Sequence, residues 1–169
     1  MYACFDVDYR ENRARSACVV FDEWTDEVER ARYSVELDVP APYTPGALFE
    51  RELPCLLAVL ETVSERAQLR GLIVDGYAWL DSAQTRAGLG AHLWSALECS
   101  LPVIGVAKNP FADAGAIELL RGQSAKPLYV TGAGIATSDA ADRIAKMAGE
   151  FRIPTLLRHV DQLSRRWAT

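Results

Sequence analysis

Residues 2–9 read YACFDVDY, and this stretch decides the fold because it sets acidic residues into an apolar strand. Side chains alternate between the two faces of a strand, so the even-numbered residues share one face: Tyr2, Cys4, Asp6 and Asp8. Burying a carboxylate is unfavourable unless it is paired or binds a metal. Asp6 therefore marks either a strand end that meets water or a polar site.

The segments after residues 2–9 continue the strand pattern. Two more apolar stretches, SACVVFD at 16–22 and VERARYSVELD at 28–38, follow after the polar turns RENR and WTDE. Short turns between alternating stretches are typical of antiparallel strands. The first 38 residues therefore predict a three-stranded meander.

The pattern changes to strand–helix alternation after residue 52. Apolar residues at 53, 56, 57, 60 and 63 follow helical spacing, with Pro54 in the first turn. The later segments are predicted as buried strands at 72–74, 102–107 and 127–132 and as helices at 87–99, 138–149 and 155–167. Buried strands that alternate with helices predict parallel pairing. We expect a single α/β domain over residues 1–169, with one mixed sheet flanked by helices.

Composition excludes several classes of protein. The chain has 169 residues, is 50% hydrophobic and carries a formal net charge of −5, which argues against nonspecific coating of nucleic acid. No apolar run reaches the roughly 18 residues of a membrane span, and Asp6 interrupts the stretch that a signal peptide needs. The four cysteines form no CxxC pair, so we expect buried, reduced thiols, no zinc site and a cytoplasmic location.

Three carboxylates stand where a sheet brings residues together. Asp6 lies in the first strand, Asp75 ends the strand at 72–74, and Glu52 directly precedes the predicted helix. Sites in open α/β sheets form beyond the carboxyl ends of strands. Oxygen ligands without histidine or cysteine suit Mg²⁺ or Mn²⁺, so these acids predict a metal site. The alternative for each acid is a strand-end carboxylate in water.

The motifs together resemble the endonuclease V family. FDVDY at 5–9 and IVDG at 73–76 are similar to its two aspartate motifs, and PYTPGALFERE at 42–52 is similar to its wedge segment. GLGAHL at 88–93, PVIGVAK at 102–108, and the segments KPLYVTGAG and RIPTLLRHVDQLSRR complete the ordered set. The resemblance spans essentially the whole chain, as a shortened and divergent member.

The resemblance implies a ribonuclease-H-like fold and a metal-dependent endonuclease. Such an enzyme nicks DNA, or RNA, on the 3′ side of deaminated bases such as inosine, and we expect a monomer. The catalytic residues implied are Asp6, Glu52, Asp75 and Lys108, of which the three acids hold Mg²⁺ or Mn²⁺. The residues implied to contact nucleic acid are Tyr43 as the wedge, Pro45, Arg51 and Gly76. The residues alone favour Tyr43 as a loop aromatic packed on the core. They leave Lys108 open between a lysine that reaches the scissile phosphate and a solvated strand-end lysine.

Several positions depart from the family pattern. Tyr77 and Ala78 stand where histidine and glycine are usual, Ala133 replaces a histidine, and the segment 109–127 is too short for the usual hairpin. These changes put inosine specificity in question more than metal binding. Two alternatives follow: a binding protein of this fold with impaired catalysis, and a metal-dependent phosphatase or nuclease with another substrate.

Overall fold

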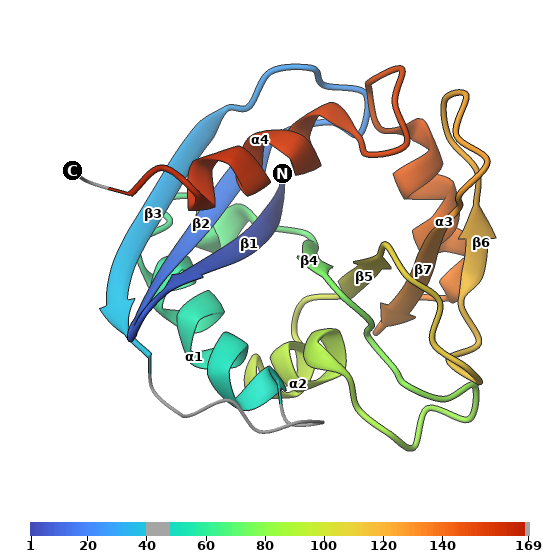
Figure 1. The fold of residues 1–169 in the computed structure, drawn as a ribbon, viewed down its shortest axis with the longest axis horizontal. Helices are drawn as coiled ribbons and strands as arrows, with labels where there is room; N and C mark the ends of the chain where they lie inside the picture. Colours follow the sequence, from blue (N-terminus) through green and yellow to red (C-terminus); the bar gives the residue numbers. More distant parts are fainter. Residues whose placement is uncertain (40–47, 168–169) are drawn as a thin grey trace.

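Seven strands form one mixed sheet in the computed structural model, which describes residues 1–39 and 48–167. The strand order is β3-β2-β1-β4-β5-β7-β6, with four α-helices against the sheet (Figure 1). The strands are β1 (Tyr2–Arg10), β2 (Arg13–Phe21), β3 (Ala31–Asp38), β4 (Leu72–Asp75), β5 (Val103–Ala107), β6 (Ile117–Leu119) and β7 (Leu128–Ala133). The helices are α1 (Leu48–Glu61), α2 (Leu89–Ala96), α3 (Thr137–Lys146) and α4 (Thr155–Ser164).

The predicted meander is confirmed. Strand β1 pairs antiparallel with β2, and β2 pairs antiparallel with β3. Strands β1, β4 and β5 are parallel neighbours, as the alternation with helices predicts. The mixed sheet flanked by helices is therefore the predicted fold class.

The pairing of the last strands corrects the prediction. Strand β7 runs antiparallel to β5, and β6 pairs antiparallel with β7 to form a hairpin at the sheet edge. The segment 109–127 contributes the single strand β6 to this hairpin, and β7 is the other strand. Parallel pairing requires a crossover back to the starting edge, usually by a helix. Among the described residues, no helix lies between β5 and β7. The chain instead forms β6 and then turns into β7, which therefore runs in the opposite direction to both β5 and β6.

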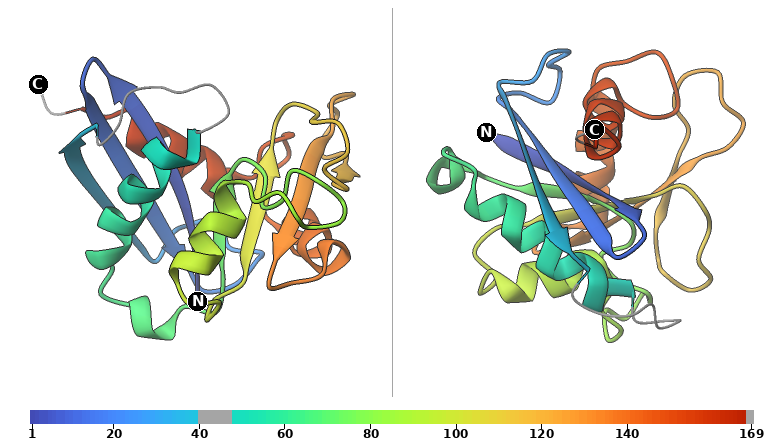
Figure 2. Two further views of the ribbon diagram at one scale, coloured as in Figure 1. Left: turned by 90° about the horizontal axis from the view of Figure 1, so that it is seen from below. Right: turned by 60° about the vertical axis from the view of Figure 1, so that its left-hand side comes forward.

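Each face of the sheet buries a separate apolar core. Helices α3 and α4 cover one face, where Tyr2 and Cys4 of β1 pack with Ile144 and Leu156. Helices α1 and α2 cover the other face, where Phe5 packs among residues that include Leu56 and Leu93. Figure 2 shows α1 and α2 on one side of the sheet and α4 on the other. The alternation in residues 2–9 thus assigns Asp6 to the α4 face.

The turn after β4 depends on a close approach between backbones. Gly76 has φ +134°, a conformation that L side chains rarely adopt. The next residues cross over Gly105 of β5, where an added Cβ would lie 2.4 Å from the Ala78 nitrogen and 2.6 Å from the Gly76 oxygen. The Ala78 N–H donates to the Thr131 hydroxyl at 2.8 Å, which fixes the crossing. This turn sets the backbone that follows Asp75.

The structure bears on two expectations from composition, the absence of a membrane span and the burial of the cysteines. The helices of the described residues are all too short or too polar to cross a membrane. Three of the four free cysteines, Cys4, Cys18 and Cys55, are buried as expected, but Cys99 is exposed. It follows the short helix α2, whose end lies at the surface because the predicted helix 87–99 stops at Ala96.

Replacing Gly105 tests the crossing. Gly105→Ala should lower the free energy of unfolding by about 1–3 kcal/mol, because the methyl group must displace the backbone of residues 76–78. Gly71→Ala is the matched control, since its Cβ would meet nothing closer than 3.4 Å. That control should be neutral or stabilising by up to about 1 kcal/mol. Urea unfolding of both variants measures the difference, and equal stabilities would show that the crossing is not tight.

Candidate active site

The register between β1 and β4 brings two acids level with each other. Phe5 pairs with Val74 at the end of the parallel ladder, so Asp6 and Asp75 are the next residues on the two strands. Asp75 in turn pairs with Val106 of β5, and Lys108 lies two residues beyond on the same face. Lys108 Nζ donates to Asp75 Oδ2 at 2.6 Å. Three of the predicted residues therefore gather at the carboxyl ends of three parallel strands.

Glu52 reaches this place from the opposite face of the sheet. Helix α1 begins at Leu48, so Glu52 lies inside the helix and not just before it, as was predicted. Pro54 consequently sits in the helix interior, where it removes one backbone hydrogen bond. Tertiary packing outweighs that loss, because Leu56, Val59 and Leu60 of α1 are almost fully buried. The helix directs Glu52 toward the strand ends.

The three acids line one small cavity. Asp6, Glu52 and Asp75 surround a space of about 110 Å³, closed on its apolar side by residues that include Phe5 and Leu89. Burial, with added repulsion from Asp75 and Asp6, raises the pKa of Glu52 from its ordinary value of 4.5 to about 7. Burial also raises the pKa of Asp6, and the charge of Asp75 acts in the same direction. The cavity therefore carries excess negative charge.

Lys108 offsets part of this charge. Burial alone would lower the pKa of Lys108, but its hydrogen bond and ion pair with Asp75 outweigh burial and raise it. Both side chains remain about two-fifths exposed. The ammonium group is therefore charged, accessible to a ligand from solvent and held beside the acids.

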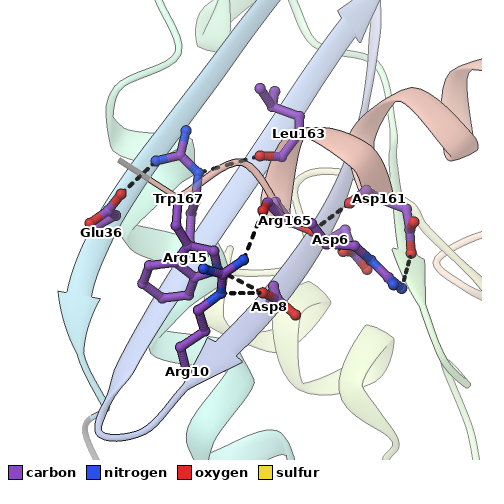
Figure 3. A network of polar contacts seen from close by, with 10 residues as sticks. Asp6, Asp8, Arg10, Arg15, Glu36, Asp161, Leu163, Arg165 and Trp167 are labelled. Atoms are coloured by element: carbon purple, nitrogen blue, oxygen red, sulfur yellow. Dashed lines mark hydrogen bonds and ion pairs between the residues drawn. The ribbon is translucent and has the colours of Figure 1, made fainter. Parts of the chain in front are cut away.

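Two residues of α4 that the sequence did not single out complete the site. The buried Ser164 hydroxyl donates to Asp6 Oδ2 at 2.5 Å and so fixes that carboxylate. Asp161 lines a second cavity with Asp6, Asp75 and Lys108. Figure 3 shows Asp6 on β1 facing Asp161 on α4. Asp161 and Ser164 are three residues apart, so they lie on the same side of the helix. That spacing could have predicted from the sequence that both side chains point toward the sheet.

A polar network holds the end of α4 against the sheet (Figure 3). Trp167 Nε1 donates to Asp8 Oδ2 at 2.7 Å. Arg15 donates to the Leu163 carbonyl at 3.3 Å and to Glu36 at 2.7 Å. Asp8, which shares a strand face with Asp6, therefore anchors the C-terminal segment rather than joining the acids.

The residues predicted to contact nucleic acid divide into two groups. Tyr43 and Pro45 lie outside the described residues. The Arg51 guanidinium lies 4.3 Å from the centre of the Tyr9 ring. Gly76 directly follows Asp75, and its N–H donates to the Val106 carbonyl at 3.0 Å. Arg51 and Gly76 thus flank the acids on two sides.

The positions that depart from the family pattern form a small apolar cluster. Ala78 and Ala133 are buried together with Ala91, and Trp79 and Trp94 pack against them. Tyr77 stays partly exposed, and its hydroxyl donates to the Asn109 carbonyl at 2.8 Å. Ala133 pairs with Val103 at the start of β5, whereas Asp75 pairs with Val106 near its end, so the apolar cluster lies toward the other end of the strands from the acids.

The acids suit a hard divalent cation in kind and in charge. Carboxylate oxygens line the cavity, and burial, with repulsion from Asp75 and Asp6, raises the pKa of Glu52. Within the part of the chain that the structure describes, however, no three side chains of the metal-binding types converge closely enough to hold an ion as they stand. Asp75 is engaged by Lys108 instead. Binding by all three acids would require their carboxylates to come closer together; Lys108 contacts Oδ2 of Asp75 and not Oδ1.

Comparison with known proteins identifies the family. The profile described as Endonuclease V matches residues 1–121. The chain is 34% identical to the endonuclease V of Streptomyces avermitilis over 184 aligned residues, which cover 95% of this chain and 77% of the relative. The chain belongs to the endonuclease V family. The endonuclease V of Rhodospirillum centenum is also similar, with 32% identity over 93% of this chain and 73% of the relative.

Solved endonuclease V structures share the fold. The crystal structure of the Streptomyces avermitilis protein superposes with a TM-score of 0.77 and 29% identity, over 98% of this chain and 79% of that one. The Ciona intestinalis endonuclease V, crystallised with a DNA that contains an inosine, superposes with a TM-score of 0.79 and 18% identity, over 98% and 84% of the two chains. The sheet is therefore the ribonuclease-H-like sheet of this family.

The raised pKa of Glu52 predicts a pH-dependent stability. Below about pH 4.5, Glu52 is protonated in both the folded and the unfolded protein. Above about pH 7 it is charged in both, and the charge then destabilises the folded protein to the full extent. In EDTA, Glu52→Gln should therefore be more stable than the wild type at pH 8, by up to about 3 kcal/mol. The gain should shrink as the pH falls from 7 toward 4.5.

Urea unfolding at pH 5 and pH 8 measures this difference. Glu50→Gln, at an exposed position in the same helix, is the matched control and should show no comparable change between the two pH values. A Glu52→Gln variant that is less stable than the wild type at pH 8 would show that the carboxylate is a structural partner.

Proposed function

We propose that the chain is a divalent-metal-dependent endonuclease that cleaves DNA beside a deaminated base such as inosine. The observation that carries the proposal is the gathering of Asp6, Glu52 and Asp75 around one cavity, with Lys108 beside them, in a member of the endonuclease V family. Phosphodiester hydrolysis requires stabilisation of negative charge on phosphate oxygens. A cationic centre at these acids supplies that stabilisation.

The carboxylates of Asp6, Glu52 and Asp75 would hold Mg²⁺ or Mn²⁺. When bound, such an ion supplies Lewis-acid chemistry and makes water a better nucleophile. The support for this assignment is the oxygen-only donor set and the pKa of Glu52, raised to about 7 where carboxylates repel one another. A cation in the cavity would relieve that repulsion.

The chain's own residues prepare the site for a phosphate. The Lys108 ammonium, freed from Asp75, can donate to a phosphate oxygen. Ser164 orients Asp6 through its hydroxyl, so that one carboxylate oxygen stays free for the cavity. Asp161 adds a fourth carboxylate near Asp6 and Lys108. We assign Lys108 to charge stabilisation and Ser164 to positioning.

Recognition of the substrate falls to the segment before α1 and the turn after β4. We propose that Tyr43, with Pro45, separates the strands at a damaged base, and that Arg51 and Gly76 contact the nucleic acid near the cut. Unpairing is easiest at a damaged or mismatched base, and an inserted side chain can replace lost stacking. The DNA complex of the Ciona intestinalis relative supports a nucleic-acid substrate.

A second candidate is a nucleic-acid-binding protein with impaired cleavage. The apolar cluster of Ala78, Ala91 and Ala133 favours it, because a polar residue expected near the site is replaced by a buried alanine. Inosine-containing DNA that binds tightly in EDTA and is not cut in Mg²⁺ or Mn²⁺ would establish this function instead.

A nicking assay tests the proposed activity. The wild type should nick a duplex with one deoxyinosine in Mg²⁺ or Mn²⁺, leave an undamaged duplex intact and be inactive in EDTA. Asp6→Asn should slow nicking more than about 100-fold, because several kcal/mol of charge stabilisation are lost. Asp142→Asn, an exposed aspartate on α3, is the control and should nick as the wild type does. Failure of a well-folded wild type to cut either DNA or RNA would overturn the assignment.

Tyr43→Ala tests the strand-separating role. The variant should bind an inosine-containing duplex more weakly by about 1–3 kcal/mol, the contribution of one base–aromatic stack. Binding to the same lesion in a single strand should change less, because no strands need to be separated. Fluorescence anisotropy on both ligands measures the effect, and equal losses would contradict a wedge.

A further inference from the structure

A second hollow continues the active site along the outer side of α4. The cavity that contains Asp6, Asp75 and Lys108 is also lined by Ile153 and Arg158. The same two residues line a larger hollow of about 580 Å³, together with Gln123, Ser124, Glu150, Phe151 and Arg152. We call this larger hollow the Phe151 groove. It borders the cavity of Asp6, Asp75 and Lys108 through these two shared residues.

The walls of the groove are the loop after α3 and the loop after β6, which lie side by side (Figure 1). Arg121 joins them: its buried guanidinium donates to the carbonyls of Met147 and Phe151, the latter at 3.1 Å. Arg152 in turn donates to the Pro127 carbonyl at 2.6 Å and to the Lys108 carbonyl. The groove is therefore built on the same backbone that carries Lys108.

The groove presents an aromatic ring and positive charge. The Phe151 side chain is 52% exposed, although exposed phenylalanines are unfavourable in water. The Arg158 guanidinium lies 4.9 Å from the centre of this ring. Arg158 Nε is buried and has no hydrogen-bond partner among residues 1–39 and 48–167. Glu150 is the one acid among the residues that line the groove.

We propose that the Phe151 groove binds an unpaired segment of the substrate strand that flanks the scissile phosphate. This inference rests on the proposed nuclease function. Single-stranded nucleic acid is held by positive grooves that follow the backbone and by aromatic rings on which bases stack. Phe151 supplies the ring, and Arg158 supplies a donor for a phosphate. Continuity with the site selects nucleic acid as the occupant over a protein segment.

Binding of oligonucleotides with different flanks tests the groove. A duplex with one deoxyinosine is prepared blunt, or with a single-stranded extension of about 8 nucleotides on the 5′ or the 3′ side of the lesion strand. Anisotropy in EDTA measures affinity without cleavage. The wild type should bind one of the extended forms more tightly than the blunt form, and that gain should fall as salt rises.

Variants test whether the tighter binding of the extended duplex depends on the Phe151 ring and on the Arg158 charge. Phe151→Ala and Phe151→Leu should lose about 5- to 100-fold of the affinity for the extended form and leave the blunt form unchanged. Arg158→Gln should reduce the salt dependence of the same gain. Val28→Ala, an exposed apolar residue in the loop between β2 and β3, is the control and should keep the gain.

Crosslinking guards against an indirect effect on folding. A 5-bromouracil in the extension should photocrosslink to residues 151–158 of the wild type. No gain from either extension, or a gain that Phe151→Ala retains, would overturn the proposal and point to another occupant. An equal loss on blunt and extended forms, without crosslinks in residues 151–158, would also overturn it.

The outcomes separate this inference from the proposed function. Nicking at inosine without any effect of flank or Phe151 would leave the nuclease assignment standing and remove the groove. Flank-dependent binding that Phe151→Ala abolishes, in a protein that never nicks, would keep the groove and remove the nuclease.

Discussion

Burial of mutually repelling carboxylates where the ladder between β1 and β4 ends is the constraint on which the site depends. Parallel pairing of Phe5 with Val74 makes Asp6 and Asp75 the next residues on adjacent strands, and α1 adds Glu52 from the other face. Burial prevents water from screening these charges fully, so the pKa of Glu52 rises to about 7. The protein offsets the repulsion with the Lys108 ammonium and the Ser164 hydroxyl. The divalent cation that we propose for this cavity would compensate the charge further.

Helix α4 connects this site to the rest of the molecule. Its buried residues Leu156 and Val160 belong to the core on the Asp6 face of the sheet. Asp161 and Ser164, further along the helix, point toward Asp6. Arg158 lines the Phe151 groove. Contacts of Arg15 and Trp167 hold the end of the helix in place. The helix that completes the core therefore also sets the position of Asp6 and the extent of the surface next to it.

The turn after β4 leads from Asp75 into a separate apolar cluster. Ala78 and Ala133 are packed as core residues, with Trp79 and Trp94 around them. The backbone of the turn after Asp75 is fixed within this packing, since the Ala78 N–H donates to the Thr131 hydroxyl.

The sequence by itself determined the sheet and most of the acids. Alternation in residues 2–9 assigned Asp6 to one face, and the apolar runs predicted the strands that carry Asp75 and Lys108, because side-chain period follows directly from backbone geometry. The sequence did not determine that β7 runs antiparallel to β5, because the same apolar run suits a parallel or an antiparallel strand. The hairpin with β6 sets the direction of β7. Tertiary structure alone placed Glu52 inside α1, because packing of Leu56 and Leu60 extends the helix back past Pro54. It also brought Ser164 to Asp6 across 158 positions of the chain. Contacts of that separation depend on how helices pack on the sheet, which no local pattern encodes.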